Sequence, residues 1–202
     1  MKIICIGRNY ARHARELNNP VPEEPVVFCK PESSLCRDGV PFIYPAFTNN
    51  LQYECEIVLR ICKTGKHIEI NAAAAYYDQW TVGIDFTARD LQQKLKDQRL
   101  PWELAKAFDQ SAAIGRWVTF TAEERYASTF SLKQNGRELQ SGTTADLLFS
   151  FEKLISFLSE YFTLETGDLI FTGTPEGVGP VQQNGALTGW LNGKQLLHLE
   201  IR

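Results

Sequence analysis

Two Asn-Gly pairs, at residues 135–136 and 192–193, each separate two runs of alternating apolar and polar residues. Asn-Gly between such runs is a strong signal for a tight β-hairpin, because both central residues of that turn need positive φ. Further short apolar runs predict strands at 1–7, 26–30, 41–45, 51–62, 81–86, 114–120 and 168–173. The chain must therefore fold around mostly antiparallel β-structure.

Helical patterns are few by comparison. An amphipathic pattern predicts one long helix within 144–162, and shorter helices are predicted at 10–17, at the alanine-rich 69–80 and at 87–98, the last with Thr87 as N-cap. Neither repeats nor a linker divide the 202 residues. We therefore expect a single α+β domain spanning 1–202, with a few short helices on a mostly antiparallel assembly.

The charge of the chain bears on its partners and location. A net charge of -3 without a lysine or arginine run gives no electrostatic reason to expect nucleic acid or an anionic membrane as partner, so a small molecule is the better default. The first residues become charged too early for a signal peptide, and there is no stretch of about 18 apolar residues. These features predict a cytoplasmic protein.

Two glutamates, Glu54 and Glu56, lie two positions apart within the run 51–61. On a strand they would share one face, with their Cα atoms about 7 Å apart. Two interpretations are open at this point: both carboxylates face water on a half-solvated strand, or both converge on a hard cation.

Asp85 is a candidate third carboxylate, because it ends the apolar run 81–86 just before a predicted helix. Alone, it is better explained as an acid at a helix N-terminus. Together with Glu54 and Glu56 it would complete a set of oxygen ligands suited to Mg²⁺, with Mn²⁺ as the alternative ion.

His13 and Glu16 are three residues apart on the predicted helix 10–17 and therefore neighbours on one face. A carboxylate in that place would orient the imidazole and raise its basicity, which suits a general base that activates water. The simpler interpretation is an ordinary surface ion pair.

Three further residues are candidates for binding an anionic substrate. Lys106 lies between two alanines and is expected to point inward, Arg8 follows the first strand, and Thr174 lies in the glycine-rich stretch 171–179. An inward cation would stabilise a substrate carboxylate or a developing enolate, although most such side chains are simply solvated.

In their order along the chain, these segments resemble the fumarylacetoacetate hydrolase family, in particular its short single-domain acylpyruvases and oxaloacetate decarboxylases. The segments that carry the resemblance are GRNYARHAREL (7–17), FCKPESSL (28–35), YECEIVL (53–59), GIDFTARDLQ (83–92), PWELAKAFDQSAAIG (101–115) and GDLIFTGTPEGVGPV (167–181).

The resemblance implies a mixed, mostly antiparallel β roll, usually a homodimer, and assigns roles to the candidate residues. It implies Mg²⁺ ligands at Glu54, Glu56 and Asp85, a catalytic dyad of His13 and Glu16, and contacts to a 2-keto acid from Arg8, Lys106 and Thr174. Gln92 is implied as a neighbour of that site, whereas Asn49 and Gln52 depart from the family pattern.

The implied activity is Mg²⁺-dependent C–C cleavage of small β-keto acids, by acylpyruvate hydrolysis or oxaloacetate decarboxylation, through a metal-stabilised pyruvate enolate with assistance from Lys106. Two alternatives stay open. One is isomerisation or decarboxylation of 2-hydroxy-diene dioates in aromatic catabolism, and the other is a non-catalytic module that binds a metabolite.

Overall fold

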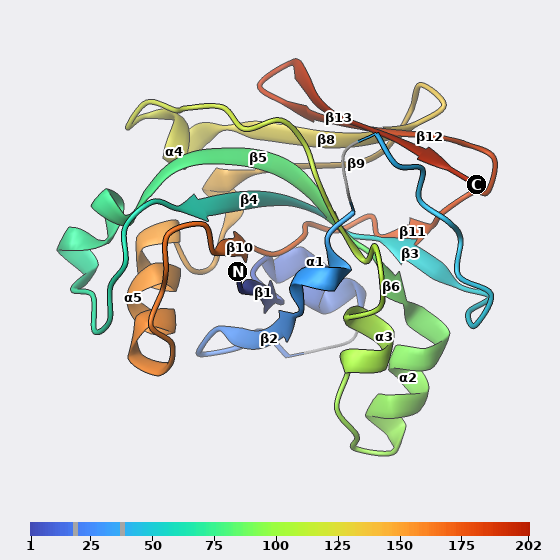
Figure 1. Cartoon of the computed structure of the whole chain (residues 1–202), viewed down its shortest axis with the longest axis horizontal. Helices are drawn as coiled ribbons and strands as arrows, with labels where there is room; N and C mark the ends of the chain where they lie inside the picture. Colours follow the sequence, from blue (N-terminus) through green and yellow to red (C-terminus); the bar gives the residue numbers. More distant parts are fainter. Residues whose placement is uncertain (18–19, 37–38) are drawn as a thin grey trace.

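Three β-sheets form the framework of the protein, as a computed structural model of residues 1–17, 20–36 and 39–202 shows (Figure 1). The first sheet has the order β2-β1-β10-β4-β5-β7, with β1 (Ile3–Gly7), β2 (Val26–Lys30), β4 (Cys55–Ile61), β5 (Tyr77–Asp85), β7 (Ala112–Ile114) and β10 (Leu169–Phe171). The second has the order β11-β3-β6, with β3 (Leu51–Tyr53), β6 (Thr87–Ala88) and β11 (Gly179–Pro180). The third has the order β13-β12-β8-β9, with β8 (Thr129–Gln134), β9 (Arg137–Thr143), β12 (Gly185–Leu191) and β13 (Lys194–Ile201).

The helices are short and lie around these sheets (Figure 1). They are α1 (Ala11–Glu16), α2 (Arg89–Asp97), α3 (Glu103–Lys106), α4 (Glu124–Ala127) and α5 (Phe151–Tyr161), with 3₁₀ turns η1 (Glu32–Ser34), η2 (Ile70–Tyr76) and η3 (Thr144–Asp146). Strands β1 and β10 pair in parallel, and the other neighbouring strands of the three sheets pair antiparallel. This confirms the predicted α+β class with mixed, mostly antiparallel sheets. No helix among the described residues is long and apolar enough to cross a membrane.

Strand β4 is buried on both of its faces. Ile57 and Leu59 belong to the main core, which includes residues of the four-stranded sheet above them, whereas Val58 packs in a second cluster with Phe171 on the other face. A half-solvated strand is therefore the wrong interpretation of this segment, and its charged residues must be neutralised inside the protein.

Both Asn-Gly hairpins are confirmed. Asn135 and Gly136 join β8 to β9 with φ of 52° and 80°, and residues 192–193 join β12 to β13 in the same way. The helix predicted over 144–162 is confirmed in its later part as α5, whereas 144–146 form η3. Ser150 caps the first turn of α5 by accepting a hydrogen bond from the N–H of Lys153 at 3.3 Å.

Several predicted elements are wrong in part. The strand predicted at 114–120 overlaps β7 only at Ile114, with a single further bridge from Val118 to Trp80. The helix predicted at 69–80 is the 3₁₀ turn η2 followed by strand residues, because 77–80 pair with β4 and tertiary pairing outweighs alanine propensity. Thr87 is not an N-cap but part of β6, paired with Gln52, and α2 starts after it. The predicted strand 41–45 is reduced to a single bridge from Phe42 to Ile201.

Candidate metal centre and active site

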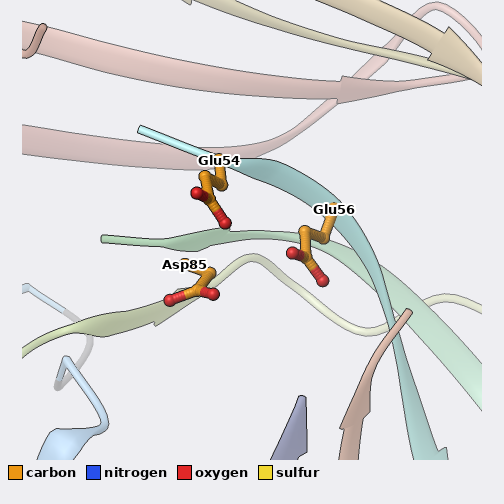
Figure 2. A group of neighbouring side chains, drawn as sticks. All are labelled: Glu54, Glu56 and Asp85. Carbon is orange, nitrogen blue, oxygen red and sulfur yellow. The ribbon is translucent and has the colours of Figure 1, made fainter. Parts of the chain in front are cut away.

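Glu54, Glu56 and Asp85 converge at the ends of two neighbouring strands. Glu54 lies at the junction of β3 and β4, Glu56 is the second residue of β4, and Asp85 ends β5. The N–H of Asp85 donates to the backbone C=O of Glu54 at 2.9 Å, which fixes the two strand ends beside each other. One carboxylate oxygen from each residue lies within 4.8 Å of the others, and the three side chains turn toward one another (Figure 2).

Glu54, Glu56 and Asp85 are all buried, with exposed fractions of 6%, 2% and 1%. Buried carboxylates need hydrogen bonds or opposite charge, because losing water costs an isolated ion several kcal/mol. The partners of each carboxylate therefore decide what the site can bind.

Lys106 is the central partner of two of them. Its buried ammonium donates to Glu54 Oε2 at 2.8 Å, to Asp85 Oδ2 at 2.7 Å and to Thr87 Oγ1 at 2.6 Å. Burial alone would lower the pKa of Lys106, but the charges of Asp85 and Glu54 outweigh it and raise that pKa. Lys106 is thus a buried cation, as its small-residue setting predicted.

Two more cations complete the inner shell, and the sequence did not single them out. Lys30 Nζ lies 2.8 Å from Asp85 Oδ1, and Arg89 donates to Glu54 and also, through Nε, to Gln52 Oε1 at 2.7 Å. Arg89 belongs to the segment 83–92, where its spacing from Asp85 offered a signal. Lys30 offered none, because a lysine at the end of a short strand normally faces water.

Glu56 differs from the other two carboxylates, because none of the cations among the described residues lies within ion-pair distance of it. Its Oε2 accepts one hydrogen bond, from the N–H of Gly173 at 2.7 Å. Gly173 has φ of 102°, and a Cβ there would lie 2.7 Å from Asn9 Cβ, so only glycine places its N–H at Glu56 without strain.

The charge environment separates the two glutamates. Burial first, and then the negative charges of Asp85 and Glu54, raise the pKa of Glu56 well above its usual value. Burial opposes ionisation of Glu54 as well, but the charges of Lys106 and Arg89 outweigh it and hold the pKa of Glu54 below its usual range. Glu56 is therefore the carboxylate of the cluster that lacks a neutralising cation.

This donor set fits a hard divalent cation. It consists of carboxylate oxygens from three residues, two of them polarised by buried cations and one without a cation. Mg²⁺ and Mn²⁺ prefer such oxygen ligands, and a divalent ion at Glu56 would supply the positive charge that is missing there.

His13 and Glu16 are brought to the same place from helix α1. His13 is 4% exposed, and its Nδ1 lies 3.2 Å from Glu16 Oε2. Glu16 also accepts hydrogen bonds from the N–H of Gly177, at 3.0 Å to Oε1 and 3.2 Å to Oε2. The pair is therefore held on both sides and is more than a solvated surface ion pair.

One small cavity of about 50 Å³ is lined by His13, Glu54, Glu56 and Lys106. Its lining includes Arg8, His13, Leu17, Phe28, Glu54, Glu56, Arg89, Gln92, Lys96, Trp102, Lys106 and Thr174. A larger cavity, lined by residues 35–36, 39–41, 113–117 and 196–200, lies apart from these three carboxylates.

Thr174 holds the loop after β10 against β4. Its hydroxyl donates to the C=O of Cys55 at 2.9 Å and accepts from Gln140 Nε2 at 2.7 Å. Because its proton is engaged by the backbone, the hydroxyl is better suited to accept than to donate a hydrogen bond to a ligand. Gln140 also accepts from the N–H of Cys55 at 2.9 Å and was not anticipated from the sequence.

Known proteins match this chain over nearly its whole length. Residues 2–201 match the family model described as fumarylacetoacetate (FAA) hydrolase C-terminal. The chain is 38% identical over 201 residues to the mouse protein named oxaloacetate tautomerase FAHD1, mitochondrial, covering 99% of this chain and 91% of that protein. It is 39% identical over 198 residues to Escherichia coli oxaloacetate tautomerase YcgM, covering 96% and 90%.

Solved structures also match this chain over nearly its whole length. A fumarylpyruvate hydrolase from Pseudomonas aeruginosa, in complex with Mn²⁺ and pyruvate, matches with a TM-score of 0.92 at 37% identity, covering 100% of this chain and 89% of that one. A 2-hydroxyhepta-2,4-diene-1,7-dioate isomerase from Mycobacterium marinum matches with a TM-score of 0.85 at 28% identity, covering 99% and 73%.

Proposed function

Because the chain belongs to the fumarylacetoacetate hydrolase family, we propose that it is a divalent-metal-dependent enzyme that acts on small β-keto acids. The observation that carries this proposal is the convergence of Glu54, Glu56 and Asp85, together with a cavity that Glu54, Glu56, His13 and Lys106 line. The names of the mouse, Escherichia coli and Pseudomonas relatives support oxaloacetate or fumarylpyruvate as the kind of substrate.

A divalent ion on the three carboxylates would supply a Lewis acid for the carboxylate and 2-oxo group of the substrate and for the enolate that forms from it. Mg²⁺ is the ion we propose, with Mn²⁺ as the substitute that the Pseudomonas complex contains. Lys106 lies against two of the carboxylates, and its ammonium would place a second positive charge beside the developing 2-oxyanion.

The dyad on α1 would serve as the base. Glu16 accepts from the Nδ1 side of His13 and from the N–H of Gly177, which leaves Nε2 of His13 as the proton acceptor. In acylpyruvate hydrolysis His13 would take a proton from water while the oxygen adds to the distal carbonyl carbon. Cleavage of the bond to C3 then gives a carboxylic acid and the enolate of pyruvate, which is protonated at C3. We propose Arg8 and Thr174 as further contacts to the substrate.

Interconversion of the keto and enol forms of oxaloacetate is a second candidate, favoured by the names of the mouse and Escherichia coli relatives. It needs the same base to take a proton from C3 and the same cations beside the 2-oxo oxygen, which gains a proton to give the enol, and no C–C bond is broken. Decarboxylation of oxaloacetate reaches the enolate by loss of CO₂. Isomerisation of a diene dioate also moves a proton beside a carbonyl, in line with the Mycobacterium marinum structure.

A homodimer and a cytoplasmic location complete the proposal. The dimer is proposed from the resemblance to the family. The location is proposed from the sequence alone, and the mouse relative is described as mitochondrial.

A substrate panel tests this proposal. Acetylpyruvate, oxaloacetate and a 2-hydroxy-diene dioate are each incubated with the protein, with Mg²⁺ and with a chelator, and products are followed by NMR. We expect turnover of at least one of them that depends on the metal. Glu56→Gln keeps the side-chain shape and an oxygen for Gly173 N–H, and it should lower that rate by about 10³-fold or more, as expected for loss of a ligand.

Products separate the candidates. Acetate with pyruvate identifies hydrolysis, CO₂ with pyruvate identifies decarboxylation, and faster exchange at C3 of intact oxaloacetate identifies tautomerisation. A non-catalytic module would bind these acids without turning any of them over. Full activity with chelator, or full activity of Glu56→Gln with metal, would contradict the proposal.

A further inference from the structure

Four cationic side chains line the active-site cavity, and they fall into two pairs. Arg89 and Lys106 are bonded to the carboxylates Glu54 and Asp85. Arg8 and Lys96 have neither a hydrogen bond nor an ion pair from their side chains to any residue within 1–17, 20–36 and 39–202, although both line the same cavity. Their charges are therefore available to a ligand.

The fold brings Arg8 and Lys96 together at a cost. Arg8 follows the last residue of β1 with φ of 62°, a left-handed conformation that costs a non-glycine residue of order 1–2 kcal/mol. Lys96 is partly buried near the end of α2, and burial first, then the charges of Arg8 and Arg89, lower the pKa of Lys96. Strained backbone and crowded like charges are features typical of a binding site.

The balance of charge indicates the sign and number of groups on the ligand. Three cations in the inner part of the site, Lys30, Arg89 and Lys106, equal its three carboxylates in number, although they are bonded only to Glu54 and Asp85. The positive charges of Arg8 and Lys96 are therefore not neutralised by carboxylates of the described residues. A bound divalent ion would add further positive charge to the cavity. A substrate with a single carboxylate, bound near that ion, would leave Arg8 and Lys96 without an anion.

We propose that Arg8 and Lys96 form a second anion subsite at this cavity, which binds the distal carboxylate of a 2-oxo dicarboxylate substrate. The inference rests on the proposed function, and it narrows the substrate class from β-keto acids in general to those with a charged far end. Oxaloacetate and acylpyruvates that end in a carboxylate belong to this class, whereas acetylpyruvate does not.

Binding of two matched acids tests the subsite without turnover. 2-Oxoglutarate and 2-oxovalerate have the same chain length and the same 2-oxo acid end, and they differ only in the distal carboxylate. Calorimetry on the Mn²⁺-loaded protein should show a preference for 2-oxoglutarate of about tenfold or more, the size expected for one charge-assisted hydrogen bond. Lys96→Gln should reduce that preference to about twofold or less.

Matched variants keep the result interpretable. Lys94→Gln removes an exposed lysine from the same helix and should keep the full preference. Arg8→Gly removes the other charge at a position whose positive φ suits glycine, and it should also reduce the preference. Equal affinity of the wild type for the two acids, or an equal loss for both acids in Lys96→Gln, would overturn the subsite.

A kinetic arm distinguishes failure of the subsite from failure of the proposed function. With oxaloacetate and acetylpyruvate, Lys96→Gln should lower kcat/KM for oxaloacetate about tenfold more than for acetylpyruvate. If neither acid reacts but 2-oxoglutarate is still preferred through Lys96, the proposed function fails and the subsite stands. If both acids react and Lys96→Gln affects them equally, the subsite fails and the proposed function stands.

Discussion

The inner and outer ends of the cavity use cations in opposite ways. At the inner end Lys106 is buried against Glu54 and Asp85, each within 2.8 Å of its ammonium. At the outer end Lys96 faces Arg8 and Arg89 and forms no ion pair with the carboxylates of the described residues. The inner cation neutralises charge that the protein itself buries, whereas the outer one is held ready for charge that a substrate brings.

The largest expected effect on stability follows from removing the inner cation. Lys106→Met leaves Glu54 and Asp85 without the cation that lies between them, and breaking a buried ion pair typically costs about 3–5 kcal/mol. Urea unfolding without metal should show a loss of this order in the free energy of unfolding. Mn²⁺ should recover more of it in the variant than it adds to the wild type, because a divalent ion replaces the lost charge.

Lys94→Met is the matched control, since Lys94 is an exposed lysine of similar size, and it should unfold like the wild type. If Lys106→Met were as stable as the wild type without metal, the inner ammonium would not be neutralising the cluster.

The smallest expected effect is at the outer end. Lys96→Gln removes a charge that has like-charged neighbours and no bonded carboxylate among the described residues, so the free energy of unfolding should change by less than about 0.5 kcal/mol. Urea unfolding in the same buffer measures it. A loss comparable to that of Lys106→Met would show that both cations are structural and would remove the contrast between the two ends.

Much of the site was predictable because its members carry strong local patterns. Two glutamates two apart in an apolar run predicted a shared face, and Asp85 at the end of another run predicted a third carboxylate. The structure places all three within reach of one ion. The setting of Lys106 between alanines correctly indicated an inward side chain.

The remainder depends on contacts between distant segments, which no local pattern contains. Lys30, at the end of β2, contacts Asp85, at the end of β5, although β1, β10 and β4 lie between these strands in the sheet. Gly173, which donates to Glu56, is 117 residues away from it in sequence. The same reason explains the error at 77–80, where pairing with β4 extends an alanine-rich segment into a strand. The break between β3 and β4 at Glu54 was equally hidden within one continuous apolar run.

The most direct test of the metal centre is anomalous scattering from a crystal of the wild-type protein soaked in Mn²⁺. We expect one strong peak in contact with carboxylate oxygens of Glu54, Glu56 and Asp85, with the ammonium of Lys106 moved off at least one of them. Saturating Mn²⁺ that gives no peak among these three side chains, or a peak bound by other residues alone, would contradict the account.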